Sequence, residues 1–436
     1  MNHAVGCPTF QIECAQLSDL GMKRLNNQDS VAVLVTDDAA TWSQRGHLMM
    51  VADGMGAHAA GELASKLAVD NVPHTYFKLR DLYPPAALRQ AIRDANTLIH
   101  TKGQSAIGFQ GMGTTCSCLV LLPHGALVAH IGDSRVYRIR GDQLCQLTFD
   151  HSLVWEMAAA GHIAEQDVPP YIPKNVITRS LGPHETVNID LEGPYDAAPG
   201  DLFLLCSDGL SGQVPDAEIG VLLQCLSPAE AVQTLVDLAN LRGGPDNISV
   251  IIARIVGDGS SSPPGPDAED CQQMPSRRDG TLLRAAGIAC LFALTFSLLK
   301  QMWLAATVSA AGLAAAIGLL LARHNGRRAS TSQSAGPIGG PYGNGPYRQL
   351  RCPPNREVFD NFQESIGRLR QLRDDHRPAI DWTSQEKLES ESLAAADAHD
   401  YGLAVDRFAA TLRETMREIR ERSGTVDDHP TVDHRL

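Results

Sequence analysis

The sequence predicts an α+β fold for the first 256 residues, because short apolar strands alternate there with helical stretches. Residues 48–51 form one such strand, a continuous apolar run bounded by turn residues, whereas residues 61–79 and 86–103 have the character of helices. After Val256 the composition changes abruptly to a polar stretch rich in Pro, Gly and Ser. The chain of 436 residues is therefore expected to hold one folded domain followed by further segments.

Aspartates lie at the ends of several of these apolar strands. Asp53 follows the strand 48–51, Asp133 and Asp208 follow the apolar parts of ALVAHIGDSR and DLFLLCSDGL, and Asp246 comes just before ISVII. A single aspartate at a strand end is usually a turn or a helix cap. Four carboxylates that converge on one rim, however, repel one another unless cations lie between them. Oxygen ligands without a cluster of His or Cys suit Mg²⁺ or Mn²⁺, so the pattern predicts a divalent-metal site.

Eight segments, in this order, resemble the successive motifs of the bacterial metal-dependent serine/threonine phosphatases of the type-2C (PPM) family. They are LSDLGMKRLNNQDS (17–30), VADGMGAHAAGE (51–62), GMGTTCSCLVL (111–121), AHIGDSRVYRIR (129–140), LTFDHS (147–152), ITRSLG (177–182), LCSDGL (205–210) and GGPDNISVIIARI (243–255). The resemblance covers about residues 10–256. It implies an αββα four-layer sandwich, in which helices flank two antiparallel sheets, with a binuclear Mn²⁺ or Mg²⁺ centre at one end.

The resemblance also implies which residues would hold the metal ions. Asp53 would bridge two ions, with the carbonyl oxygen of Gly54 as a further ligand, and Asp208 and Asp246 would complete the inner shell. Asp133 matches the aspartate that helps to hold a third, weaker ion in bacterial members of the family. Two ions held in this way would lower the pKa of a bridging water and so provide a hydroxide that attacks phosphorus. The expected cofactor is therefore two, or with the third site three, Mn²⁺ or Mg²⁺ ions.

Arg24 has the spacing of the family's phosphate-binding arginine, and a guanidinium group binds phosphate oxygens in pairs. Three positions depart from the family pattern: Gln28 stands where some members have glutamate, Met55 where eukaryotic members have histidine, and Ala57 where glycine is more usual. The expected catalytic aspartates are all present. Residues 151–180 resemble the flap that lies beside the active site of these enzymes and influences which phosphoprotein docks.

Cysteine usage and charge narrow the class of protein. The 10 cysteines include no C-x-x-C pair, which disfavours a zinc or thioredoxin-like site. Their scattered placement fits a reducing compartment. A net charge of −13 is unfavourable for nucleic-acid binding, so no nucleic acid is expected as a partner.

A long apolar segment predicts attachment to a membrane. Residues 257–280 form a polar linker, and the following segment 281–324 contains apolar runs of 15 and 21 residues at 285–299 and 302–322, separated by Lys300. Arginines flank the segment on both sides, which favours a hairpin with both ends in the cytoplasm. A single crossing and a buried helical pair remain open. The expected location is the inner (cytoplasmic) membrane, with the catalytic domain in the cytoplasm.

The remainder of the chain is expected to be helical after a second flexible linker at 325–355. Within the helical region 356–424, Phe359, Phe362, Ile366 and Leu369 recur at intervals of three and four residues and so fall on one face of a helix. Thr383-x-x-Glu386 predicts a capping box at the start of the next helix. Residues 393–419 resemble one tetratricopeptide-like helix pair. A small helical bundle and a partner-docking module are the two interpretations.

These observations predict a membrane-tethered phosphatase that removes phosphate from serine and threonine in cytoplasmic proteins, opposing a Ser/Thr kinase. Two alternatives remain: a phosphoprotein-binding adaptor with low activity, and a phosphatase of an anti-anti-sigma-type regulator. The complete set of metal-binding aspartates favours an enzyme over an adaptor.

Overall fold

The computed structural model describes residues 11–56, 59–161, 176–256, 340–376 and 381–423. The chain divides into two units: residues 1–258 together with 340–436 form the first, and residues 259–339 form the second. All elements below belong to the first unit. The predicted linker 257–280 and the predicted membrane segment 281–324 lie outside the described residues. Within the described residues, no helix combines the length and the hydrophobicity needed to cross a bilayer.

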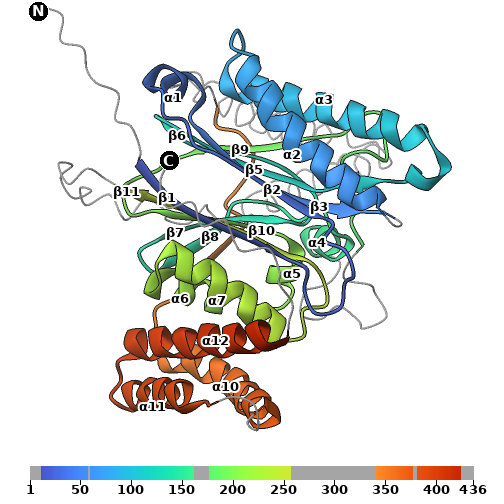
Figure 1. Ribbon diagram of the computed structural model, residues 1–436. Coiled ribbons are helices and arrows are strands. Elements are labelled where there is room, and N and C mark those ends of the chain that lie inside the picture. The colour runs from blue at the N-terminus through green and yellow to red at the C-terminus, as the bar shows by residue number, and fades with distance from the viewer. Residues whose placement is uncertain (1–10, 57–58, 162–175, 257–339, 377–380, 424–436) are drawn as a thin grey trace, which may run out of the picture. The chain divides into compact units, whose positions relative to one another are not determined.

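Two antiparallel sheets form the centre of the first unit (Figure 1). One sheet has the strand order β1 (Gln11–Asp19), β11 (Ile248–Val256), β10 (Leu202–Cys206), β7 (Arg135–Arg140), β8 (Gln143–Gln146) and β12 (Arg348–Arg351). The other has the order β2 (Asp29–Leu34), β3 (His47–Met55), β5 (Cys116–Leu122), β6 (Gly125–Ile131) and β9 (Asp190–Tyr195), with β4 (Gly113–Thr114) paired to β3. Two antiparallel sheets accompanied by helices confirm the predicted α+β class.

Alternating side chains of both sheets fill the space between them. Met49 and Val51 of β3 pack in one hydrophobic cluster with Phe203 and Leu205 of β10 and with Ile251 of β11, all of them fully buried. Because side chains alternate across a strand, the other residues of these strands face outward and need helices to cover them. The sequence of β3 is apolar on both faces for this reason.

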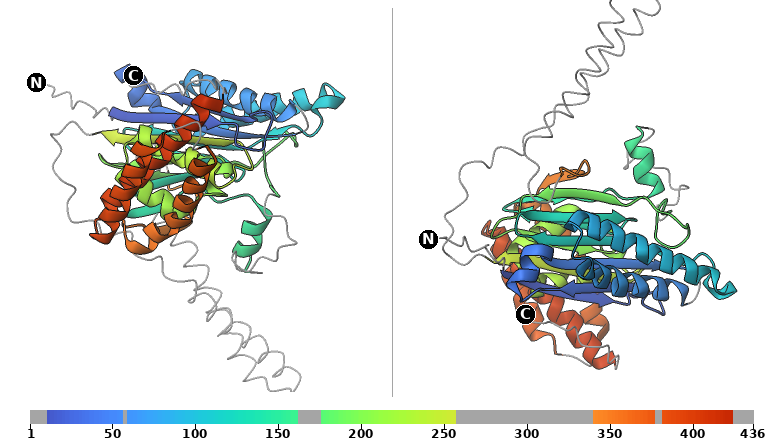
Figure 2. Two further views of the ribbon diagram at one scale, coloured as in Figure 1. Left: turned by 60° about the horizontal axis from the view of Figure 1, so that its bottom comes forward. Right: turned by 90° about the horizontal axis from the view of Figure 1, so that it is seen from above.

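Helices cover the outer face of each sheet. On the β3 side lie α1 (Ala39–Arg45), α2 (Ala60–Lys78) and α3 (Pro84–Gln104), and α2 and α3 run side by side across the sheet in the right-hand view of Figure 2. On the β10 side lie α6 (Asp216–Cys225) and α7 (Pro228–Leu241). Short elements connect these parts: the 3₁₀ turn Ile107–Phe109, α4 (Leu153–Ala159) and α5 (Asp208–Ser211). The result is the predicted order of helix, sheet, sheet and helix.

The three C-terminal helices pack against the sandwich rather than standing apart from it: two of them lie on α6 and α7, and the third packs on those two (Figure 1). They are α10 (Arg356–His376), α11 (Thr383–Asp397) and α12 (Tyr401–Ser423). The apolar face predicted from Phe359 and Phe362 is buried in the same cluster as the outer face of the β10 sheet, and the Phe362 ring stacks on Phe408 with 4.7 Å between centroids. The helices thus add a further layer to the sandwich.

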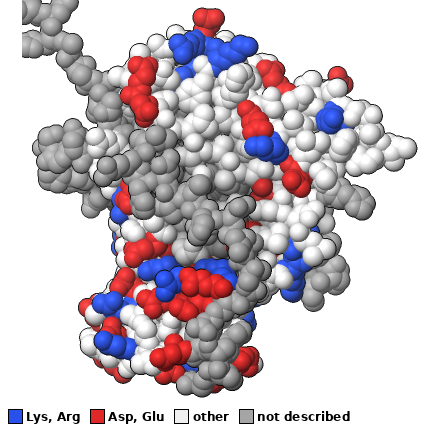
Figure 3. Space-filling view, viewed as in Figure 1, with Lys and Arg blue, Asp and Glu red and all other residues white. Residues whose placement is uncertain are grey.

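Ion pairs join these helices to α7. Arg413 and Arg420 of α12 pair with Glu230 and Asp237 at 3.2 and 2.5 Å, and the side chain of Asp237 is fully buried. Figure 3 shows basic and acidic side chains gathered side by side over this part of the molecule.

Two local predictions in the C-terminal half are wrong. Part of the predicted flexible linker 325–355 is ordered on the sandwich, since residues 348–351 form β12 at the edge of a sheet. A strand at an edge is stabilised mainly by pairing with its neighbour, so a Gly/Pro-rich sequence without periodicity conceals it. The predicted capping box is also absent: Thr383 is the first residue of α11, and its hydroxyl donates to Asp381.

Candidate active site

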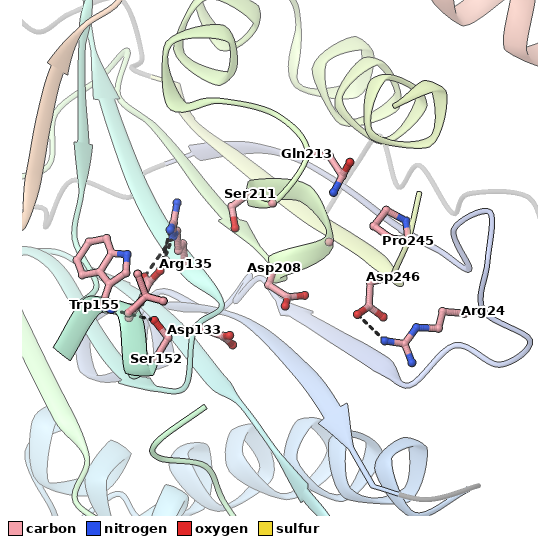
Figure 4. Close-up of a pocket in the computed structure, with 14 residues that line it drawn as sticks. Arg24, Asp133, Arg135, Ser152, Trp155, Asp208, Ser211, Gln213, Pro245 and Asp246 are labelled. Atoms are coloured by element: carbon pink, nitrogen blue, oxygen red, sulfur yellow. Dashed lines mark hydrogen bonds and ion pairs between the residues drawn. The ribbon is translucent and has the colours of Figure 1, made fainter. Parts of the chain in front are cut away.

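A pocket of about 600 Å³ lies where strand ends of both sheets come together (Figure 4). Its lining includes four residues that the sequence predicts for the site, Arg24, Asp133, Asp208 and Asp246. Arg24 and Asp246 lie at one end of the view in Figure 4, Trp155 lies at the other, and Asp133 and Asp208 lie between them. The fold therefore gathers residues that are more than 200 positions apart in the sequence.

Strand topology explains why these aspartates meet. Asp208 is the first residue of α5 and follows β10 after Ser207, while Asp246 precedes β11, which is hydrogen-bonded to β10. Asp133 lies in the short turn from β6 to β7 and therefore connects the two sheets. Asp53 lies near the end of β3, where the register places it opposite Asp29 of β2.

The backbone around Asp53 is held tightly. Its amide donates to the Thr115 hydroxyl at 2.8 Å, and its carbonyl oxygen accepts hydrogen bonds from Thr114 Oγ1 and the Thr115 amide. The next residue, Gly54, has no space for a side chain, because a Cβ there would lie 2.2 Å from the carbonyl oxygen of Gly61. This close approach of two backbones accounts for the glycine after the predicted bridging aspartate.

The carboxylates raise one another's pKa. Burial, and then the charges of Asp29 and Asp208, raise the pKa of Asp53 well above its ordinary value. Burial and the charges of Asp208 and Asp150 raise the pKa of Asp133 to about 8, and burial raises the pKa of Asp29 to about 7. The pKa of Asp208 is raised by burial and by Asp246, and its carboxyl group is in hydrogen-bonding contact with that of Asp53. Such a cluster is costly unless positive charge lies close to it.

The residues present fit divalent metal ions. One carboxylate oxygen each of Asp29, Asp133 and Asp208 is buried without a hydrogen-bond donor in the described part of the chain. Carboxylate and backbone carbonyl oxygens are the ligands that Mg²⁺ and Mn²⁺ prefer. Across the described residues, no three His, Cys, Asp or Glu side chains already stand at ligating positions around one point. The fit therefore rests on the chemistry, burial and mutual repulsion of the carboxylates and not on a preformed ligand set.

Arg24 supplies positive charge at one end of the pocket. Its guanidinium donates to Asp246 Oδ2 at 2.6 Å, and the two side chains are 47% and 34% exposed. The loop that carries Arg24 lies against the Asp246 backbone: Gly21 has a φ of +77°, and a Cβ there would lie 2.1 Å from the Asp246 carbonyl oxygen. Only glycine allows this contact.

Asn247 fastens the Arg24 loop and was not predicted from the sequence. Its side-chain NH₂ donates to the carbonyl oxygens of Leu20 and Asn26, and its Oδ1 accepts from the Gln28 amide at 2.8 Å. One side chain thus holds both ends of the loop beside Asp246. The only signal for Asn247 in the sequence is its place next to Asp246. That position does not reveal that Asn247 binds the backbone of the Arg24 loop.

Asp29 is the second residue that sequence analysis did not assign to the site. It is 8% exposed, and the Ser207 hydroxyl donates to its Oδ2 at 2.7 Å. It precedes the apolar run VAVLV as Asp246 precedes ISVII, so the same signal marks both. Gln28 points its NH₂ toward the Gly56 carbonyl oxygen at 3.5 Å, and Ala57 lies outside the described residues.

Arg135 and Trp155 form the other end of the pocket. Arg135 pairs with the buried Asp150 at 2.7 Å, and its guanidinium lies 5.6 Å from the Trp155 ring centroid. Trp155 belongs to α4, a helix within the predicted flap, and the hydroxyl of Ser152 accepts from its amide at the start of that helix. Flap residues 162–175 lie outside the described residues.

A sandwich of two antiparallel sheets with a cluster of aspartates and an arginine at one end defines a metal-dependent phosphatase class. The protein phosphatase 2C family profile matches residues 22–239, and the chain belongs to this family. The chain is thus an enzyme, a protein-serine/threonine phosphatase, and members of the family use Mn²⁺ or Mg²⁺.

Sequence and structure comparisons agree on the extent of the likeness. A putative protein phosphatase 2C-type of Streptococcus pyogenes is 38% identical over 240 residues, which cover 54% of this chain and 94% of that protein. Protein phosphatase PhpP of Streptococcus pneumoniae is 37% identical over 250 residues, covering 55% and 96%. The solved structure of the S. agalactiae serine/threonine phosphatase is 32% identical, with a TM-score of 0.50, and the match covers 56% of this chain and 100% of that one.

Proposed function

We propose that this protein hydrolyses phosphoserine and phosphothreonine in cytoplasmic proteins, opposes a Ser/Thr kinase, and is tethered to the inner (cytoplasmic) membrane. The observation that carries the catalytic part is the convergence of Asp133, Asp208 and Asp246 on a pocket that also contains Arg24, with the carboxyl group of Asp53 in hydrogen-bonding contact with that of Asp208. A phosphate group needs both of these features, because oxygen ligands recruit the metal ions and a guanidinium binds the phosphate oxygens.

The roles that we propose for the aspartates come from the resemblance to the family, and their burial and mutual charge support them. Asp53, Asp208 and Asp246, with the Gly54 carbonyl oxygen, would hold two ions, and Asp133 would help to hold a third. Mn²⁺ or Mg²⁺ supplies Lewis-acid activation of water and neutralisation of phosphate charge when bound. The raised pKa values of these buried carboxyl groups mean that each bound cation favours their ionised form and releases protons.

Arg24 would orient the substrate. Its guanidinium uses one N–H group on Asp246 and retains further N–H donors in the same plane for phosphate oxygens. Asp246 thereby holds the arginine beside the ions, and Asn247 keeps the loop in place. The phosphorus atom is then bound between the arginine and the aspartate cluster.

The membrane tether rests on the composition of residues 281–324. The chain leaves the first unit at Asp258 and enters it again at Gly340. If this segment spans a membrane, both of its ends must lie on the same side, because both belong to one folded unit. This supports two crossings, and hence the hairpin over the single crossing. Protease added to bacterial spheroplasts should spare epitope tags at both termini; removal of the C-terminal tag alone would contradict the hairpin.

The catalytic proposal is tested with the full-length chain in detergent and a phosphothreonine peptide. We expect turnover with Mn²⁺ that EDTA abolishes, and Asp208→Asn should lower kcat by about two orders of magnitude or more without loss of fold. Folded wild-type protein that binds Mn²⁺ but does not turn over would favour the phosphoprotein-binding adaptor. Activity of Asp208→Asn close to wild type would refute the metal assignment.

A further inference from the structure

The chain segment 340–352, which returns to the sandwich after residue 339, is bonded to β9 and then to β8. Tyr342 exchanges backbone hydrogen bonds with Gly193 of β9. Tyr347 donates its hydroxyl to Glu192 at 2.5 Å, and the Gly345 amide donates to the same carboxylate at 2.9 Å. The buried Glu192 thus holds the segment at several points before β12 begins.

The register of β12 then fixes the position of Arg348. Its strand pairs with β8 so that Arg348 lies opposite Gln146 and Arg351 lies opposite Gln143. Directly after the strand, Cys352 is buried against α6, where its amide donates to the Asp142 carbonyl oxygen at 2.8 Å. Arg348 is held on both sides and cannot slide along the edge without losing these contacts.

Arg348 reaches a residue that lines the catalytic pocket. Its guanidinium lies 4.3 Å from the centroid of the Trp155 ring, closer than the Arg135 guanidinium at 5.6 Å. Phe149 adds an aromatic link, since its ring packs edge to face on both Trp155 and Tyr347 with 5.4 Å between centroids in each case. The returning segment therefore supports Trp155 through both a cation and a ring.

The charges around Arg348 explain why an arginine is stable there. Arg348 lies 3.6 Å from Asp216 Oδ2, and Arg135 lies 3.7 Å from the other oxygen of the same carboxylate, Asp216 Oδ1. Arg135 also pairs with Asp150. Two carboxylates thus compensate two guanidinium groups that approach one indole ring. A cation held over a Trp face in a partly dry setting contributes more than an exposed one.

We propose that Arg348 is a positioning residue of the active site: it holds Trp155 and α4 as the wall that contacts the protein chain on either side of the phosphorylated residue. This inference rests on the proposed phosphatase function and deepens it. The wall lies at the end of the pocket away from Arg24 and Asp246, so it contacts the substrate beyond the phosphate itself (Figure 4). Segment 340–352 thereby couples the C-terminal helices to substrate choice.

The test compares two substrates on the full-length chain in detergent with Mn²⁺: a phosphothreonine peptide, whose chain reaches the wall, and p-nitrophenyl phosphate, which has no peptide chain for the wall to contact. For Arg348→Ala, we expect kcat/KM for the peptide to fall about fivefold more than kcat/KM for p-nitrophenyl phosphate, mainly through KM. Arg348→Lys keeps the charge but not the planar stacking, and should show an intermediate loss of selectivity.

A matched control and a double variant isolate the contact. Arg351→Ala removes an exposed arginine from the same strand and should leave the ratio of the two kcat/KM values at the wild-type level. Trp155→Ala should lower the same ratio, and adding Arg348→Ala to it should cause no further fall, because the arginine acts through the ring.

Three results would overturn the inference. An unchanged ratio in Arg348→Ala would show that the wall does not read the peptide, and equal losses for both substrates with a lowered melting temperature would show a purely structural role. Additive effects in the double variant would show that Arg348 does not act through Trp155. If the wild-type protein hydrolyses neither substrate, the proposed phosphatase function fails first, which is a distinct outcome.

Discussion

At the scale of single residues, Arg24 and Asp246 form an ion pair that is only partly exposed and that places a guanidinium beside the aspartate cluster. Arg24→Ala should raise KM for a phosphothreonine peptide roughly tenfold, because a hydrogen-bonded charge pair with phosphate is lost. Steady-state kinetics with Mn²⁺ measure the effect. Lys23→Ala, which removes the neighbouring exposed cation, serves as the control and should behave as the wild type. Equal kinetics for both variants would remove Arg24 from the site.

Asp133 allows a prediction about pH. Its pKa in the folded protein is raised to about 8 by burial and by neighbouring carboxylates, so without metal the folded state binds a proton that the unfolded state releases near its ordinary value. The free energy of unfolding of the EDTA-treated protein should therefore fall as the pH rises from about 4 to about 8.

Asp133→Asn removes this charge and should raise the melting temperature of EDTA-treated protein at pH 8 more than at pH 5. Thermal unfolding followed by circular dichroism measures the difference. Asp81→Asn, in an exposed turn, is the control and should leave both values unchanged. If the melting temperature of Asp133→Asn changes with pH in the same way as that of the wild type, the raised pKa and the burial assigned to Asp133 are contradicted.

Asp29 and Asp53 show what single residues reveal in a sequence and what they do not. The position of Asp53 after an apolar strand and before Gly54 indicates only a turn or a helix cap when it is taken alone. Asp53 was selected because three other aspartates share this position and because its segment resembles a motif of the family. The partnership with Asp29 depends on the register of β2 and β3, which a one-residue slip would destroy. Asn247 is a similar case, since its three hydrogen-bond partners lie about 220 residues away in the chain.

At the scale of elements, α12 is held against α7 by a carboxylate at the interface. The Asp237 side chain is fully buried, and burial raises its pKa to about 6 although Arg420 lies 2.5 Å away and lowers it. Arg420→Ala should lower the free energy of unfolding by about 2 kcal/mol, because Asp237 would stay buried without its cation.

Thermal unfolding at pH 7 measures this loss. Arg417→Ala removes a neighbouring arginine of α12 that is 60% exposed and pairs only with Glu418 among the ion pairs of the described residues, so it should have little effect. Asp237→Asn combined with Arg420→Ala should recover part of the loss. Equal stability of Arg420→Ala and wild type would show that the ion pair does not hold the helix.

Elements differ in how well their sequences predict them. The period of Phe359, Phe362 and Leu369 predicts α10 and its buried face, because an amphipathic pattern is local. β12 has no such pattern and exists through its pairing with β8. The helix capping box forms at Ser227 and Glu230 of α7 and not at Thr383, because the turn before each helix decides which hydroxyl is free to cap it.

At the scale of the whole molecule, the two parts of the first unit share one hydrophobic cluster. Phe359, Phe362 and Phe408 pack with Leu222 and Leu235 of α6 and α7. A chain ending at residue 256 would expose this surface and lose β12, so it should melt at a lower temperature than the full-length protein and aggregate.

The matched comparison for the truncated chain is a variant in which a flexible Gly/Ser linker of about 20 residues replaces residues 257–339. Such a linker spans roughly 25 Å, and the variant keeps both the sandwich and the C-terminal helices. This variant should retain the melting temperature of the full-length chain and remain soluble without detergent. Flotation with vesicles should recover the full-length chain and not the deletion variant. Co-flotation of the deletion variant would contradict the role of 281–324, and a stable 1–256 fragment would contradict the shared core.

The sequence by itself predicted the α+β class and marked four aspartates for a divalent-metal site, because strand-end carboxylates and the glycines beside them are local signals tied to metal chemistry and close backbone contact. The phosphatase chemistry was predicted from the resemblance of eight segments to the motifs of one family. Tertiary structure alone decided that the segment after residue 339 returns to the catalytic sandwich, that β12 completes a sheet, and that Arg348 lies over Trp155. The reason is physical: edge-strand pairing, a cation over a ring and a shared apolar core join residues far apart in the chain, and no short stretch of sequence records such contacts.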